Sequence, residues 1–113
     1  MNLVTILGQN SFWKVNKQLA KQVGLNSAIL YGILLSADED SRMDNGLRGS
    51  EIEHYFELSE ETVQWEANIK PSVQKTCIKN LVEQGLIKVS YVGVPKKRLF
   101  AVVDYPSNLT SNK

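Results

Sequence analysis

Two successive helix-start signals constrain the fold of this chain more than any other sequence feature. The first is Ser59-Glu60-Glu61, because a serine hydroxyl caps free backbone amides and acids favour the positive end of the helix dipole. The second is Lys70-Pro71, because proline at the first helical position sacrifices no hydrogen bond. We therefore expect one helix from Ser59 to near Asn68 and another over Pro71–Gln84.

A β-rich tail follows the second of these helices. We expect Gly85 to end the helix, and Leu86–Val92 and Lys97–Val103 are β-rich runs on either side of Gly93-Val94-Pro95. Two such runs around a short turn predict a β-hairpin. Three consecutive basic residues, Lys96-Lys97-Arg98, lie beside its turn.

The residues upstream predict buried helices and a loop. Asn16 can cap a helix over Lys17–Val23. Asn26 can cap a second helix, from about Ser27 to Asp38, which is apolar on most sides and is therefore expected in the core. Turn residues from Ser36 to Gly49 predict a loop.

Two alternatives compete over the next segment. Glu51–Leu58 alternates apolar and other residues and so predicts a strand, while a short helix over Glu51–Phe56 capped by Ser50 is the competitor.

A further short strand is expected over residues 3–7. The fold class that results is mainly α-helical with a small β-hairpin, as one domain over residues 1–105 and a polar tail over 106–113.

Charge is segregated along the chain although the net charge is only +1. Residues 37–69 carry ten acids against two arginines, and residues 70–113 carry seven lysines and one arginine against two acids. A basic segment of this kind in the last third of the chain is typical of a phosphate-facing surface. A basic face that is merely solvated explains it equally well.

Three segments have the pattern of a helix–turn–helix. In Gln18–Leu35 the second helix is almost wholly apolar, whereas a DNA-reading helix must present polar groups. In Glu51–Ile69 the second helix would turn acids toward phosphates. In Ser59–Gln84 the second helix combines an apolar side with a small, polar and basic one, and a hairpin with a basic turn follows. That order is typical of a winged helix–turn–helix.

Residues of this third candidate are expected to contact double-stranded DNA. The inward side of the helix holds Ile78, Leu81 and Cys77, with Gln74 or Val73 one turn earlier. Phosphate contacts are expected from Lys70, Lys75, Lys79, Lys96, Lys97 and Arg98. Base contacts are expected from Ser72 and Thr76, with Lys75 or Lys79 as further candidates.

The run Ile78–Ile87, IKNLVEQGLI, resembles the end of the reading helix in many bacterial winged helices. Together with Gly93–Phe100 and Ser11–Ala20, it is similar to the winged-helix domain of replication proteins from phages and plasmids of Gram-positive bacteria. The resemblance implies a winged helix with extra N-terminal helices, acting in replication initiation or replisome organisation, with replication proteins as partners. A transcriptional regulator of the same fold and a protein-binding module that uses the acidic residues 38–66 remain alternatives.

Other features favour a binding protein over an enzyme. His54 is the single histidine, so a histidine pair or histidine-based metal site is excluded, and no glycine-rich phosphate loop is present. Cys77 has no partner for a disulfide, which fits the cytoplasm, and no apolar run is long enough for a membrane span. We expect no cofactor and no metal. A homodimer is compatible with reading two half-sites, with residues 3–7 or Phe12-Trp13 as the contact.

Overall fold

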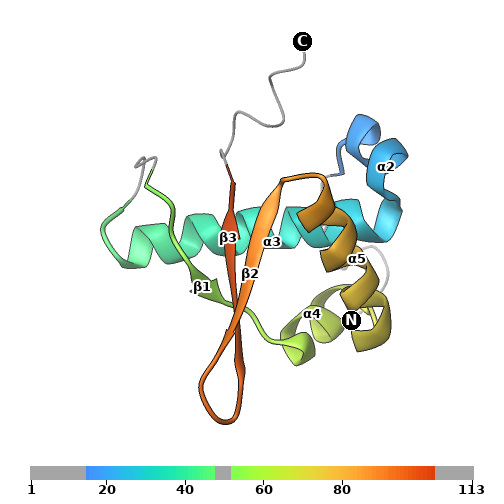
Figure 1. Cartoon of the computed structure of the whole chain (residues 1–113). Helices are drawn as coiled ribbons and strands as arrows, with labels where there is room; N and C mark the ends of the chain where they lie inside the picture. Colours follow the sequence, from blue (N-terminus) through green and yellow to red (C-terminus); the bar gives the residue numbers. More distant parts are fainter. Residues whose placement is uncertain (1–14, 48–51, 104–113) are drawn as a thin grey trace, which may run out of the picture.

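A computed structural model describes residues 15–47 and 52–103 of the 113-residue chain. In these ranges it contains four helices and three strands (Figure 1). They are, in chain order, α2 (Lys17–Val23), α3 (Leu25–Asp44), β1 (Phe56–Glu57), α4 (Glu60–Ala67), α5 (Pro71–Glu83), β2 (Ile87–Val92) and β3 (Lys97–Val102). The expectation of a mainly α-helical chain with a small hairpin is thus confirmed. The strand expected over residues 3–7 and the tail 106–113 lie outside the described residues.

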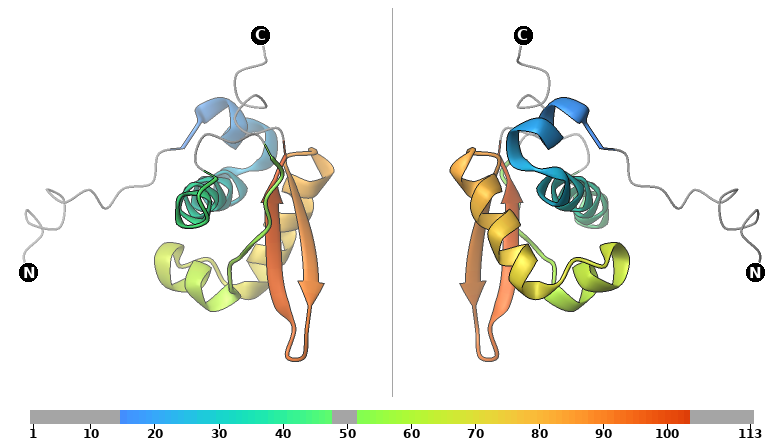
Figure 2. Two further views of the ribbon diagram at one scale, coloured as in Figure 1. Left: turned by 90° about the vertical axis from the view of Figure 1, so that its left-hand side faces the viewer. Right: turned by 90° about the vertical axis from the view of Figure 1, so that its right-hand side faces the viewer.

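The three strands form one antiparallel sheet in the order β1-β3-β2. Phe56 of β1 lies opposite Phe100 of β3, and Ile87 of β2 lies opposite Val102. In Figure 1 the long helix α3 passes behind the sheet, with α5 beside β2, and Figure 2 shows α2 and α4 at opposite ends of this assembly. The sheet and α5 thus share one side of the molecule.

The hydrophobic core fills the space between α3, α5 and the sheet. Leu30 and Leu34 of α3, Leu81 of α5 and Phe100 of β3 are all fully buried. The burial of α3 agrees with the expectation of a core helix and with the exclusion of the first helix–turn–helix candidate. No helix within residues 15–47 and 52–103 is long and apolar enough to span a membrane.

Helix α3 is longer at both ends than the sequence suggested. Its cap is Gly24 and not Asn26, and it continues to Asp44 through the segment expected to be a loop. The reason is a buried ion pair at helical spacing: Arg42 Nε donates to Asp38 Oδ2 over 2.8 Å, and the Asp38 side chain is completely buried. Residues that look like turn formers are here helix residues with a tertiary role.

The segment before α4 is neither the full strand nor the helix that the sequence offered. Only Phe56 and Glu57 form a strand, and the helix over Glu51–Phe56 is wrong because residues 52–55 have no regular structure. Side-chain contacts hold this segment instead. His54 Nε2 lies 2.7 Å from Ser41 Oγ, and Lys88 Nζ donates to Glu53 over 2.8 Å.

Helix α4 begins after the predicted cap, Ser59, and the contribution of this cap to stability can be tested. Ser59 Oγ accepts a hydrogen bond from the Thr62 amide over 3.1 Å. We expect Ser59→Ala to lower the free energy of unfolding by about 1 kcal/mol, because the amide loses its partner at the helix terminus. Urea denaturation measures the change. Ser36→Ala is the control on the exposed side of α3, and equal stability of both variants would contradict a capping role for Ser59.

Candidate nucleic-acid interface

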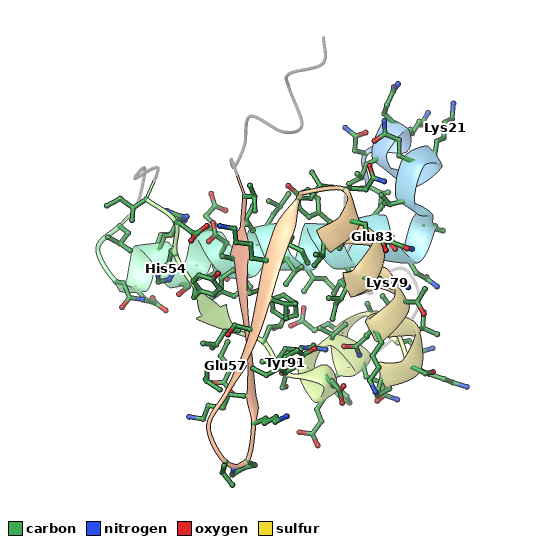
Figure 3. The ribbon with its side chains drawn as sticks, in the orientation of Figure 1. Lys21, His54, Glu57, Lys79, Glu83 and Tyr91 are labelled. Atoms are coloured by element: carbon green, nitrogen blue, oxygen red, sulfur yellow. The ribbon has the colours of Figure 1, made fainter. Side chains whose placement is uncertain are left out.

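Helix α5 divides cleanly into a buried and an exposed side. Gln74, Cys77, Ile78 and Leu81 are buried against the rest of the fold. The exposed side carries the polar and basic residues predicted from the sequence, which are Ser72, Lys75, Thr76 and Lys79. Their spacing of three and four residues aligns them in one stripe along the helix. In Figure 3 Lys79 points away from the sheet, with Glu83 one turn further along.

The turn that precedes α5 brings α4 close to it. Asn68 ends α4 in a left-handed conformation, with φ at 56°, and its amide donates to Gln64 O over 2.8 Å. Asparagine is one of the few residues with a side chain that adopts this conformation readily. Lys70 then precedes Pro71 and is exposed, at the start of the stripe. Helices α4 and α5 are therefore joined by a short turn.

The β2–β3 hairpin extends past α4 and ends in a turn around Gly93, which has φ at 84° (Figure 1). Lys96 and Lys97 are exposed at this end of the hairpin. The structure therefore places seven of the eight predicted contact residues on the surface: five of them on or next to α5 and two on the hairpin.

Arg98, the eighth predicted contact residue, lies in the interior. It is 6% exposed, its Nε donates to Leu58 O over 2.9 Å, and its Nη2 donates to Gln74 Oε1 over 3.0 Å. Its guanidinium carbon lies 4.9 Å from the centre of the Phe100 ring, a cation–π distance. Because its side chain is buried and hydrogen-bonded inside the fold, Arg98 does not suit phosphate contact.

Gln74 extends the same buried network to α4. Its Nε2 donates to Glu60 O over 3.0 Å and to Ile69 O over 2.8 Å. With Arg98, it ties the hairpin, the segment after β1, the start of α4 and the turn before α5 to one another. The sequence left either Gln74 or Val73 as the inward residue at this turn of α5, and nothing in it indicated the bonding role of Gln74. The network therefore holds the hairpin, which carries the exposed lysines, in place relative to α5, which carries the exposed stripe.

The charge on Arg98 is held in place by its surroundings. Burial lowers the pKa of the guanidinium, and electrostatic interactions with Glu60 and Tyr91 raise it again in part. An arginine remains protonated in a protein under such conditions. Arg98 therefore supplies a permanent positive charge beneath the surface, with its Nε and Nη2 bonded to Leu58 O and Gln74 Oε1.

A groove of about 480 Å³ lies between the hairpin and the start of α4. Its lining is Glu57, Ser59, Glu60, Glu61, Tyr91, Lys96, Lys97 and Arg98. Glu57 comes from β1 and Tyr91 from β2, the two strands that flank β3 (Figure 3). The hairpin lysines thus share this groove with three carboxylates, which lowers the positive potential there.

The remaining candidate residues have structural partners. His54 contacts Ser41, and Cys77 is 3% exposed in the core. Among residues 15–47 and 52–103, no group of three or more histidine, cysteine or acidic side chains is arranged to hold a metal ion.

The fold is similar to that of known DNA-binding proteins. No family model matches the sequence, and no curated protein is significantly similar to it. Two solved structures share the fold, one described as the N-terminal domain of a DNA-binding protein and the other as a Rep–DNA complex. Each has a TM-score of 0.61 and 17% sequence identity, and each match covers 92% of this chain and 82% of the other. At this identity the likeness establishes the fold alone.

Proposed function

We propose that this chain is a winged helix–turn–helix domain that binds double-stranded DNA. In this proposal α4 and α5 form the helix–turn–helix and the β2–β3 hairpin is the wing. The observation that carries it is the exposed stripe of Ser72, Lys75, Thr76 and Lys79 on α5, on the same fold as a hairpin that ends in Lys96 and Lys97. The fold shared with a Rep–DNA complex supports it.

Each exposed side chain has a distinct role in the proposed complex. The first two turns of α5 enter the major groove, which is about 12 Å wide and admits one helix. Ser72 and Thr76 then reach base edges, because their hydroxyl groups are short and both donate and accept hydrogen bonds. Phosphates are contacted by five of the exposed lysines, which are Lys70, Lys75, Lys79, Lys96 and Lys97.

We propose replication initiation as the process served, in a phage, prophage or plasmid. The resemblance of residues 78–87 and 93–100 to replication proteins and the fold of a Rep–DNA complex support this assignment. The proposed role is binding and not catalysis, because the exposed residues of the candidate interface are lysines and hydroxyl-bearing residues, which suit contacts to phosphates and base edges.

Salt dependence tests DNA binding directly. Five phosphate contacts predict a plot of log affinity against log salt with a slope of about −4.5, since each neutralised phosphate contributes about −0.9. Fluorescence anisotropy with a labelled duplex of random sequence measures the slope, and selection from a random library then identifies the preferred site. Failure to bind any duplex at low salt would overturn the proposal.

The carboxylates of the groove give a second prediction. Glu61 lines the groove with Lys96 and Lys97, so its charge opposes the approach of phosphate to the wing. We expect Glu61→Gln to tighten binding to duplex DNA by about two- to fivefold at low salt and to lose this effect as salt rises. Glu39→Gln on α3 is the matched control. Identical affinities of the two variants would show that Glu61 does not act on the wing.

A further inference from the structure

Helix α4 exposes a tryptophan that the fold does not use. Trp65 is 89% exposed, whereas Val63 on the same helix is fully buried. Two residues correspond to about 200° of rotation, so Trp65 lies on the side of α4 that faces away from the core. Tryptophan is highly buried on average in folded proteins and is enriched at interfaces.

The surroundings of Trp65 define the charge of that partner. Helix α4 carries Glu60, Glu61 and Glu66 and no basic residue, and all three acids are exposed. Phosphates would be repelled by this surface, so an unpaired base or a DNA backbone is a poor partner for Trp65. The chemistry requires a positively charged surface with an apolar side chain within it.

Such a surface exists on this chain, at the other end of α5. Helix α2 carries Lys17 and Lys21 one turn apart and no acid, and both lysines are exposed. Leu25, the first residue of α3 directly after the Gly24 that ends α2, is 60% exposed. Figure 3 shows Lys21 pointing outward at the end of the molecule opposite α4, and Figure 2 shows the two helices at opposite ends.

We propose that the α4 surface of one copy binds the α2 surface of a second copy. Trp65 packs on Leu25, and Glu66 pairs with Lys21. Since the two surfaces differ and lie at opposite ends, the contact is head-to-tail and leaves one of each surface free for further copies. The expected contact of residues 3–7 or Phe12-Trp13 in a dimer lies outside the described residues.

The proposed contact leaves the α5 stripe uncovered. The contact uses the α2 and α4 surfaces, and α5 lies between them (Figure 2). Here the inference rests on the proposed function: neighbouring copies can then bind adjacent DNA segments cooperatively. Self-association itself does not depend on DNA, so it is tested without it.

Sedimentation velocity at low salt, over a rising series of protein concentrations, tests the contact. We expect reversible self-association that weakens with salt and is weakened by roughly tenfold or more in Trp65→Ala, as for an aromatic anchor in an interface. Met43→Ser is the matched control, because Met43 is 51% exposed on α3 and outside both surfaces. A chain that remains monomeric throughout, or a Trp65→Ala variant that associates as the wild type does, would overturn the inference.

Charge reversal identifies the partner surface. Glu66→Lys and Lys21→Glu should each prevent association alone, because each brings like charges together at every contact. An equimolar mixture of the two variants should associate again, since each α4 then faces an oppositely charged α2. If the mixture stays monomeric, α2 is not the partner. Unchanged DNA affinity of dilute Glu66→Lys protein would leave the proposed function intact whichever result is found.

Discussion

Replacing Arg98 with methionine is expected to lower the free energy of unfolding by about 2–4 kcal/mol. Methionine retains much of the aliphatic volume but donates no hydrogen bond. Leu58 O and Gln74 Oε1 would then lose their bonds to Arg98 at a position where the side chain is 6% exposed. Unpaired acceptors in the interior cost free energy because water does not replace the lost donor.

Urea denaturation of two single variants and their combination measures this network. Gln74→Leu removes the acceptor for Arg98 and the donor to Glu60 O and Ile69 O. We expect the double variant Arg98→Met/Gln74→Leu to lose less than the two single losses together, because each single change leaves the other side chain buried without its partner.

Lys97→Met is the control for this experiment. Lys97 adjoins Arg98 in the sequence but is exposed, so we expect a change within about 0.5 kcal/mol. Equal unfolding midpoints for Arg98→Met and Lys97→Met would show that the guanidinium is solvated, and the buried network would be refuted.

The second half of the chain was predictable because local signals mark its boundaries. Ser59 caps α4 and Pro71 opens α5, as expected from their residue types alone. Gly85 follows α5 with φ at 74°, a conformation that favours glycine. The helices and hairpin from α4 to β3 therefore lie within about one or two residues of the predicted bounds.

The extent of α3 was not predictable from such signals. Aspartate and serine are abundant in turns, and residues 36–46 contain several of them. The helix nevertheless continues, because Asp38 and Arg42 form an ion pair in the interior and Ser41 contacts His54 from a distant segment. These stabilising contacts are tertiary, and local sequence patterns do not predict them.

The burial of Arg98 could have been predicted from the alternation of residues along a strand. Successive residues of a strand point to opposite faces, so Arg98 shares a face with Phe100 and Val102, which are both core residues. Lys97 lies on the other face. Strand alternation along β3 separates the exposed Lys97 from the buried Arg98, whereas Lys96 is exposed because it lies in the turn before the strand.

Removal of the lysine pairs should have the largest effect on DNA affinity. We expect Lys75→Ala/Lys79→Ala on α5 and Lys96→Ala/Lys97→Ala on the hairpin each to weaken binding to duplex DNA about tenfold or more. Each pair should also make the salt slope less steep by about 1.8, since two phosphate contacts are lost. Anisotropy titrations at several salt concentrations measure both quantities.

A change in base-contacting residues should behave differently. Ser72→Ala/Thr76→Ala removes two hydroxyl groups from the α5 stripe and no charge, so the salt slope should stay constant. Discrimination between the selected site and random duplex should fall, because base edges carry the sequence information and phosphates do not. The lysine pairs, by contrast, should weaken binding to both duplexes by similar factors.

Lys88→Ala supplies the charge control for these measurements. Lys88 lies on β2 outside the stripe and the turn, and its ammonium group pairs with Glu53. If general attraction between a basic chain and DNA were responsible, each lysine replaced would cost the same affinity wherever it lies. A localised interface predicts instead that Lys88→Ala leaves the salt slope unchanged while both pairs reduce it. Equal slopes for all these variants would refute the assignment of α5 and the hairpin as the DNA-binding surface.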